Sequence, residues 1–290
     1  MKLQQKLIDL YQHVCWLDVH SLKPGNVSIF ANSKDLCVDD FLNSAKVSAG
    51  PITEQHDSLG SRILHATKAT HQTVGTNTNL GIILLIAPLI HAVYVLDGLI
   101  PCEANELEEA LKNVLFATTV NDAILVYQAI RLMNPGGMGE KNNQDIAEEP
   151  NVSLLKTMKI AKHWDQIAAQ YSNNYKDVFN FGLPKFRSLK HRWQDEKWAV
   201  TGLFLGYLST YEDSLIERKY GMLKAKEISD MIRKLEMELC RSDLPGGYEA
   251  QLLQIDSQLK RDLINPGTTA DLTAASIFAS GLVNEPAAKQ

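Results

Sequence analysis

The chain has 290 residues, of which 45% are hydrophobic, and it carries 29 basic against 34 acidic side chains. A chain of this length buries a substantial core, and its mildly acidic balance provides no basic field of the kind that duplex-binding proteins use to displace counterions. We therefore expect a globular protein that binds no nucleic acid. Four scattered cysteines without a Cys-x-x-Cys pair, and no secretory signal ahead of them, indicate free thiols in a cytoplasmic protein.

Apolar residues recur at helical spacing from the first segment onward, as in Leu3, Leu7, Leu10, Val14 and Leu17. No stretch shows the sustained alternation that is typical of strands. The sequence predicts an all-α protein with one multi-helix globular domain over residues 1–290. After the first helix, further helices are predicted at 39–48, 57–74, 79–97, 103–132, 152–170, 196–210, 214–240, 249–262 and 269–283.

The segment from Leu80 to Leu96 is almost wholly apolar and nearly long enough to span a bilayer. It contains Pro88 and His91, and no polybasic cluster marks a cytoplasmic flank. We expect a buried central hydrophobic helix here, and no membrane association.

Asn77, Thr78 and Asn79 stand immediately before this apolar helix. Their side-chain oxygens would cap free backbone amides, and the same amides could face an anion. Plain capping accounts for one of the three residues but not for all of them. A phosphate site at this helix start is the functional hypothesis.

The predicted helix over 103–132 carries Thr118 and Asp122 one turn apart near its middle, while Arg131 would point to its opposite side. Asp165 lies inside the next predicted helix, among apolar and small residues. A buried carboxylate must be paired, metal-bound or protonated. Because capping does not explain a carboxylate in the middle of a helix, Asp122 and Asp165 are the candidate catalytic acids.

The loop over 134–151 is the longest predicted loop, and long loops in compact domains are often functional. Its Gly136 and Gly137 begin a stretch that is superficially similar to a phosphate loop. The preceding strand, the spacing and the hydroxyl residue of that motif are missing. We expect this loop to cover the site as a lid.

Two further helix starts hold polar clusters. Asp213 is a good N-cap with Ser214 and Arg218 on one face, although Arg218 and Lys219 could equally form a solvated face. Thr268-x-x-Asp271 fits a capping box, so Asp271 is either a cap partner or a ligand. Acids and cations together suit a magnesium-bound polyphosphate. They are Asp122, Asp145, Asp165, Asp213 and Asp271, with Lys23, Arg131, Arg218 and Lys219.

In order along the chain, six motifs resemble those of the triphosphoribosyl-dephospho-CoA synthase family. They lie at 23–28, 77–81, 118–123, 165–171, 213–221 and 265–272. The resemblance implies an all-helical transferase that uses ATP as a substrate. It would join the triphosphoribosyl unit to a ribose hydroxyl of dephospho-CoA and release adenine.

The chain departs from the citrate-lyase branch of this family, which has His and Lys at the positions of Asn79 and Leu80, and a Gly-Ser type turn where this chain has Gly267-Thr268-Thr269. The motifs look more like a branch found in archaea and in bacteria that make one-carbon pterin cofactors. Two alternatives therefore stay open: ribosyl or phosphoryl transfer to another acceptor in pterin-type coenzyme synthesis, or a non-catalytic helical nucleotide-binding protein.

Under the family chemistry, Asp122 and Asp165 are the catalytic residues, and Mg²⁺ is held by Asp122, Asp165, Asp213 and Asp271. The partners are small molecules, and a homodimer is compatible with the sequence. The residues expected to bind nucleotide or phosphate are Lys23, Asn26, Asn77, Thr78, Asn79, Arg131, Gly136, Gly137, Ser214, Arg218, Lys219, Thr268 and Thr269.

Overall fold

The computed structural model describes residues 3–30, 37–136 and 144–285. Over these ranges the secondary structure is helical, apart from an isolated bridge between Cys102 and Val283, so the predicted all-α class is confirmed. The elements are α1 (Leu3–His20), α2 (Val38–Ile52), α3 (Leu59–Val74), α4 (Leu80–Val95), α5 (Ala104–Phe116), α6 (Val120–Met133), α7 (Leu154–Ala161), α8 (Gln166–Asn173), a π-helical turn (Val178–Gly182), α9 (Leu183–Trp193), α10 (Glu196–Thr210), α11 (Ser214–Tyr220), α12 (Met222–Arg241), a 3₁₀ turn (Pro245–Tyr248), α13 (Glu249–Arg261) and α14 (Gly267–Leu282).

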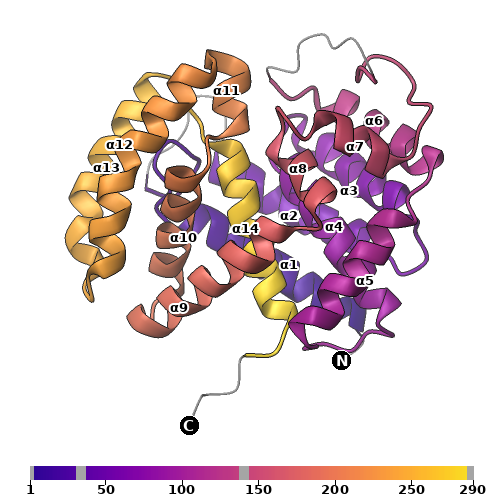
Figure 1. Ribbon diagram of the computed structural model, residues 1–290, viewed down its shortest axis with the longest axis horizontal. Coiled ribbons are helices and arrows are strands. Elements are labelled where there is room, and N and C mark those ends of the chain that lie inside the picture. The colour runs from indigo at the N-terminus through magenta and orange to yellow at the C-terminus, as the bar shows by residue number, and fades with distance from the viewer. Residues whose placement is uncertain (1–2, 31–36, 137–143, 286–290) are drawn as a thin grey trace.

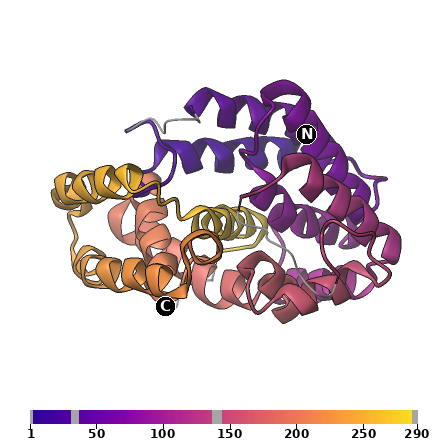
Figure 2. The same cartoon turned by 90° about the horizontal axis from the view of Figure 1, so that it is seen from above.

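The helices form two groups with α14 between them (Figure 1). Helices α2 to α8 lie on one side and α9 to α13 on the other, and the view from above shows the same division (Figure 2). The last helix contacts α1, α4, α8, α9, α10 and α11, so it joins the two groups. Residues from both ends of the chain are thereby brought to the middle of the molecule.

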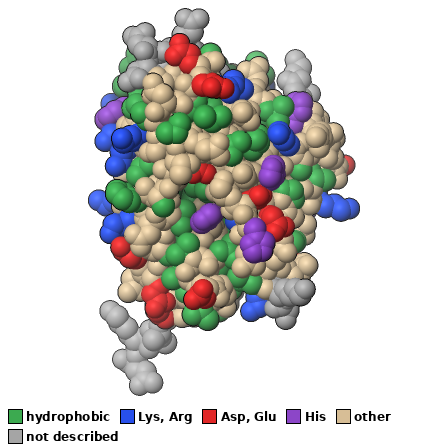
Figure 3. Space-filling model, turned by 90° about the vertical axis from the view of Figure 1, so that its right-hand side faces the viewer, with side chains coloured by type: hydrophobic (Ala, Val, Ile, Leu, Met, Phe, Trp, Pro, Cys, Tyr) green, Lys and Arg blue, Asp and Glu red, His purple; other side chains and the backbone are tan. Residues whose placement is uncertain are grey.

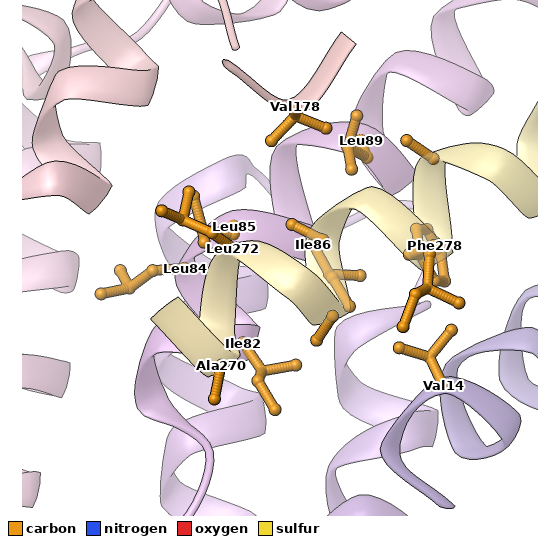
Figure 4. Close-up of a cluster of buried hydrophobic side chains, with 14 of the residues drawn as sticks. Val14, Ile82, Leu84, Leu85, Ile86, Leu89, Val178, Ala270, Leu272 and Phe278 are labelled. Atoms are coloured by element: carbon orange, nitrogen blue, oxygen red, sulfur yellow. The ribbon is translucent and has the colours of Figure 1, made fainter. Parts of the chain in front are cut away.

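Helices α4 and α14 cross at the centre of one continuous hydrophobic core (Figure 4). Ile82, Leu85 and Leu89 of α4 and Leu272 and Phe278 of α14 are buried. A helix that is apolar all round is buried on every side, which confirms the predicted central hydrophobic helix. Among the described residues, no helix combines the length and the apolar character that crossing a membrane requires.

Three predicted helices are each two helices in the structure. The 103–132 segment breaks between α5 and α6, where Thr119 caps the new helix, and the 152–170 segment breaks at Asp165, which caps α8. The 214–240 segment breaks at Gly221, whose φ of 86° is left-handed. Helical periodicity continues across each break, so apolar spacing alone does not detect them. The helix α9 was not predicted.

The surface on the α5 side of the molecule shows apolar, acidic and basic side chains interspersed (Figure 3). Basic side chains on this face stand singly or in small groups. This distribution agrees with the small net charge of −5 and gives the face no continuous positive stripe for a nucleic acid.

Candidate functional site

A pocket of about 630 Å³ lies where the starts of α4, α8 and α14 meet α11 and the end of α6. This volume is in the range of small-molecule sites, which occupy roughly 300–1,000 Å³. The predicted site residues that line it come from five of the six motifs and from the loop after α6. They are Asn26, Asn77, Thr78, Gly136, Asp165, Arg218, Lys219, Thr268 and Asp271.

Asp271 presents a half-buried carboxylate to this pocket. Within the described part of the chain, no hydrogen bond or ion pair occupies its oxygens. A Cβ added to Gly81 would lie 1.9 Å from Asp271 Oδ2, so a larger residue in the first turn of α4 would displace this carboxylate. Burial, together with the negative charges of Asp18 and Asp213, raises the pKa of Asp271 well above its usual value.

Asp165 and Arg218 form an ion pair on the pocket wall. Asp165 is the N-cap of α8, and its Oδ1 accepts a hydrogen bond from Ala168 N at 3.0 Å. Its Oδ2 lies 2.5 Å from Arg218 Nη1, which comes from α11. The expected mid-helix position of Asp165 is therefore wrong. Arg218 Nε is buried without a hydrogen-bond partner among the described residues.

The carboxylate oxygens of Asp122 already accept hydrogen bonds from neighbouring groups. It stands at the third position of α6, where Oδ2 accepts from Thr119 N at 2.8 Å and from Thr119 Oγ1 at 2.7 Å. Its Oδ1 accepts from Gly60 N at 2.9 Å. Burial opposes ionisation, but these hydrogen bonds outweigh it and lower the pKa of Asp122. The mid-helix argument for Asp122 was wrong, because this residue completes a capping box and does not line the pocket.

Asp213 is likewise committed to structure. Its Oδ1 accepts from the backbone of Leu215 and Ile216, and its Oδ2 accepts from Thr269 N at 2.7 Å and Thr269 Oγ1 at 2.8 Å. The side chain is fully buried, and this burial raises its pKa despite the four hydrogen bonds. Asp213 therefore fastens the start of α11 to the start of α14.

Lys23 is fully buried behind the pocket wall. Its Nζ donates to Asp18 Oδ1 and, at 2.6 Å, to Asn26 Oδ1, while Asn26 Nδ2 donates to Asn265 Oδ1 at 2.9 Å. Asp18, Asn26 and Asn265 line the pocket, whereas Lys23 does not. Lys23 thus orients polar groups that a ligand would touch.

The polar residues before α4 are divided between the pocket and the core. Asn77 Oδ1 accepts from Leu80 N at 3.3 Å, and Thr78 Oγ1 lies 2.6 Å from Ser44 Oγ. Asn79 turns inward and donates to buried hydroxyl groups of α1 and α2. Asn77 and Thr78 line the pocket, but Asn79 does not.

The remaining predicted residues have mixed positions. Ser214 Oγ accepts from Gln166 N at 3.2 Å and donates to Thr268 Oγ1 at 3.1 Å, behind the pocket. Arg131 lies outside the pocket and holds the loop before α7. Lys219 is exposed, and its side chain packs against Gly136. A Cβ added to Gly136 would lie 2.7 Å from Lys219 Cε. Gly137 lies outside the described residues, as does most of the stretch predicted to form a lid.

The pocket residues that the sequence reasoning missed include Asp18, Phe41 and His71. Asp18 had a detectable signal, because it continues the apolar face that Tyr11 and Val14 form on α1. A carboxylate on a buried face must have a partner or a function. Phe41 and His71 sit in ordinary amphipathic helices, and nothing in their spacing distinguishes them.

Comparison with known proteins supports this assembly of motifs. The profile of the CitG family, described as ATP:dephospho-CoA triphosphoribosyl transferase, matches residues 4–289. A crystal structure from Archaeoglobus fulgidus, provisionally described as that of a triphosphoribosyl-dephospho-CoA synthase, superposes with a TM-score of 0.63 at 26% sequence identity, covering 83% of this chain and 98% of that one. No match was found among curated proteins.

Proposed function

This chain belongs to the CitG family of ATP:dephospho-CoA triphosphoribosyl transferases, and we propose that the pocket between α4, α8, α11 and α14 is its active site. In the family reaction the bond between adenine and C1 of the ATP ribose breaks, and C1 forms a bond to a ribose hydroxyl oxygen of dephospho-CoA. The hydroxyl loses one proton and the departing adenine gains one. The observation that carries the proposal is the convergence of family motifs from both ends of the chain on one pocket. This convergence also supports one functional domain over residues 1–290.

We assign Asp271 as the base that accepts the proton of the acceptor hydroxyl. Its oxygens have no partner among the described residues and face the pocket, so they are available to a hydroxyl group. The raised pKa makes the carboxylate a stronger base than an ordinary aspartate. Oxygens already committed to capping, as in Asp122, could serve this purpose only by giving up their hydrogen bonds.

Asp165 is assigned to the reacting carbon. Positive charge develops on the ribose ring as adenine departs, and a fixed carboxylate stabilises that charge. The pair with Arg218 and the bond from Ala168 N hold Asp165 in place before substrate arrives. A preorganised group of this kind needs no rearrangement during the reaction.

The triphosphate would lie on the Lys219 side of the pocket. Lys219, Arg218 and His71 are the basic side chains lining it, and Asn77 and Thr78 add polar groups. Arg218 lines the pocket, so its guanidinium group lies beside the expected position of a phosphate or ribose oxygen. Gly136 leaves room for the Lys219 side chain at this edge.

Magnesium is part of the proposal, and only a few carboxylates of the pocket would be available to hold it. Among the described residues no group of three or more His, Cys, Asp or Glu side chains could hold a metal ion. Magnesium commonly uses one or two carboxylates and completes its shell with water and phosphate oxygens, so Asp18 and Asp271, which both line the pocket, would suffice. Asp122, Asp165 and Asp213 do not fit, because their oxygens already accept hydrogen bonds. Bound magnesium would neutralise charge on the triphosphate.

Asn79 and Leu80, together with the archaeal origin of the similar crystal structure, support placing the chain nearer the archaeal branch. Four free cysteines support a cytoplasmic location. The homodimer stays a prediction.

The direct test is adenine release from ATP, followed chromatographically with and without dephospho-CoA. We expect adenine and the triphosphoribosyl product in equal amounts, and only when dephospho-CoA is present. Adenine release that requires a pterin-type acceptor instead would contradict the proposed acceptor. ATP binding without any release would identify a non-catalytic nucleotide-binding protein.

A further inference from the structure

A second cavity of about 110 Å³ lies directly beside the active-site pocket, and we call it the annexe. The two cavities share five lining residues, so they adjoin along a common wall. The shared residues are Leu84, Ile130, Asp165, Ile167 and Arg218.

The lining of the annexe differs from that of the pocket. Apart from the shared pair, its walls are mainly apolar or aromatic, including Tyr127, Met158 and Trp164. Gln144, Asp145 and Thr157 add polar groups that can form hydrogen bonds, although Asp145 Oδ1 already accepts one from Ala147 N. A largely apolar space with a few polar groups suits a flat, uncharged heteroaromatic ring, and the negative charge of Asp145 disfavours a polyphosphate there.

The boundary between the two cavities is the Asp165–Arg218 pair, which lines both. A ligand that crosses this boundary places its linking atoms against the ion pair. The unpartnered Nε of Arg218 is a further polar atom at this boundary that lacks an acceptor.

We propose that the annexe binds the adenine ring of ATP. This inference rests on the proposed function, and it fixes the direction of the substrate. With the base in the annexe, the ribose lies at the Asp165–Arg218 pair and the triphosphate extends into the polar pocket toward Lys219. The bond that breaks is then the bond at the boundary, and adenine is the product that remains in the annexe.

Arg131, which the sequence predicts to bind phosphate, contacts the segment that forms one wall of the annexe. Arg131 Nη1 donates to Ile146 O at 2.9 Å and to Glu148 O at 3.2 Å. Tyr127 Oη donates to Gln144 O at 2.8 Å on the same segment. These bonds hold the 144–148 backbone against the annexe, so Arg131 is a positioning residue for adenine.

The test fills the annexe without touching the ion pair. Ala161, at the end of α7, lines the annexe and is partly exposed, so Ala161→Leu adds volume there. Ala169→Leu is the matched control, because Ala169 is a partly exposed helical residue that lines neither cavity. Thermal unfolding confirms that both variants are folded. Inhibition by free adenine, inhibition by inorganic tripolyphosphate and the KM for ATP are measured for each.

We expect Ala161→Leu to raise the adenine inhibition constant and the KM for ATP by about tenfold or more, since an overfilled site excludes its ligand. Inhibition by tripolyphosphate should not change, and Ala169→Leu should match the wild type. Equal adenine inhibition in the two variants would overturn the annexe assignment while leaving the transferase intact. A different result would refute the proposed function and keep the annexe assignment: the wild type binds adenine but never releases it from ATP, and Ala161→Leu no longer binds adenine.

Discussion

Two helix starts share the pattern Thr-x-x-Asp, and the structure uses them in opposite ways. At the start of α6, Thr119 is the N-cap and Asp122 reaches back to it, so the pattern forms a capping box. At the start of α14 the helix begins earlier, at Gly267 with Pro266 before it. Asp271 therefore lies two residues further into its helix than Asp122 does in α6, and it cannot reach back to the N-cap.

The difference follows from what satisfies the free amides of each helix. In α6 the local Asp122 caps its own turn. In α14 the amide of Thr269 is satisfied from outside by Asp213, the N-cap of α11. Because another helix supplies this cap, Asp271 remains free of local bonds and faces the pocket. A capping pattern in sequence thus does not say whether its carboxylate is available for chemistry.

The largest expected effect is that of Asp271→Asn on turnover. Removing a general base lowers the rate by about 10²–10⁴-fold, and the amide cannot accept the hydroxyl proton. Adenine release at saturating ATP and dephospho-CoA measures this directly. Nearly normal release from a folded Asp271→Asn protein would remove this residue from the reaction.

Asp165→Asn should lower kcat by about 10²–10³-fold, because a neutral amide stabilises the developing ribose charge less well. Asparagine is also a good N-cap, so α8 should keep its start. Single-turnover adenine release separates this loss from a change in ATP binding. If only the KM for ATP rises, Asp165 positions substrate and does not stabilise the transition state.

Asp122→Asn should instead lower the free energy of unfolding by about 1–3 kcal/mol, because the amide group cannot accept all three hydrogen bonds that the carboxylate accepts. The rate per folded molecule should stay at the wild-type value. Since folding lowers the pKa of Asp122, its ionised form stabilises the protein above the ordinary aspartate pKa. This advantage over Asp122→Asn should disappear as pH falls through the lowered value, which denaturant titrations at several pH values would show.

Asp271 should show the opposite pH dependence. Its pKa is raised on folding, so its contribution to stability is complete below the ordinary aspartate pKa and is lost as pH rises through the raised value. Asp271→Asn should therefore be more stable than the wild type at slightly alkaline pH and lose this advantage in acid. A wild type that is more stable than the variant at alkaline pH would show that the ionised carboxylate is stabilised in the fold.

Lys219→Ala should produce the smallest effect, a rise of roughly threefold in the KM for ATP, because an exposed charge is screened by solvent and salt. The difference from wild type should shrink further at high salt. Lys224→Ala, on the neighbouring helix outside the pocket, is the control.

The sequence predicted the fold better than the site. Apolar character located α4 at the centre, because a helix that is apolar all round is buried on every side. The central position of α14 was not predicted. Apolar spacing hid the break at Thr119, since no Gly or Pro interrupts 103–132 and the helical spacing of apolar residues continues on both sides of the break. The error at this break produced the mid-helix argument for Asp122.

The pocket required information that spacing does not contain. Gly81 and Asp271 are far apart in the sequence, and only the crossing of α4 and α14 brings the carboxylate against the glycine. Asp18 could have been found, because it is a charged residue on the buried face of α1. His71 could not have been found, because its position on the pocket wall depends on how the end of α3 packs in the fold.

The most direct test of the central claim is a paired measurement of adenine release by Asp271→Asn and Asp122→Asn, each expressed per folded molecule. Our account predicts that Asp122→Asn releases adenine at the wild-type rate, whereas Asp271→Asn releases almost none. The reverse outcome, with Asp122→Asn inactive though folded and Asp271→Asn active, would contradict it.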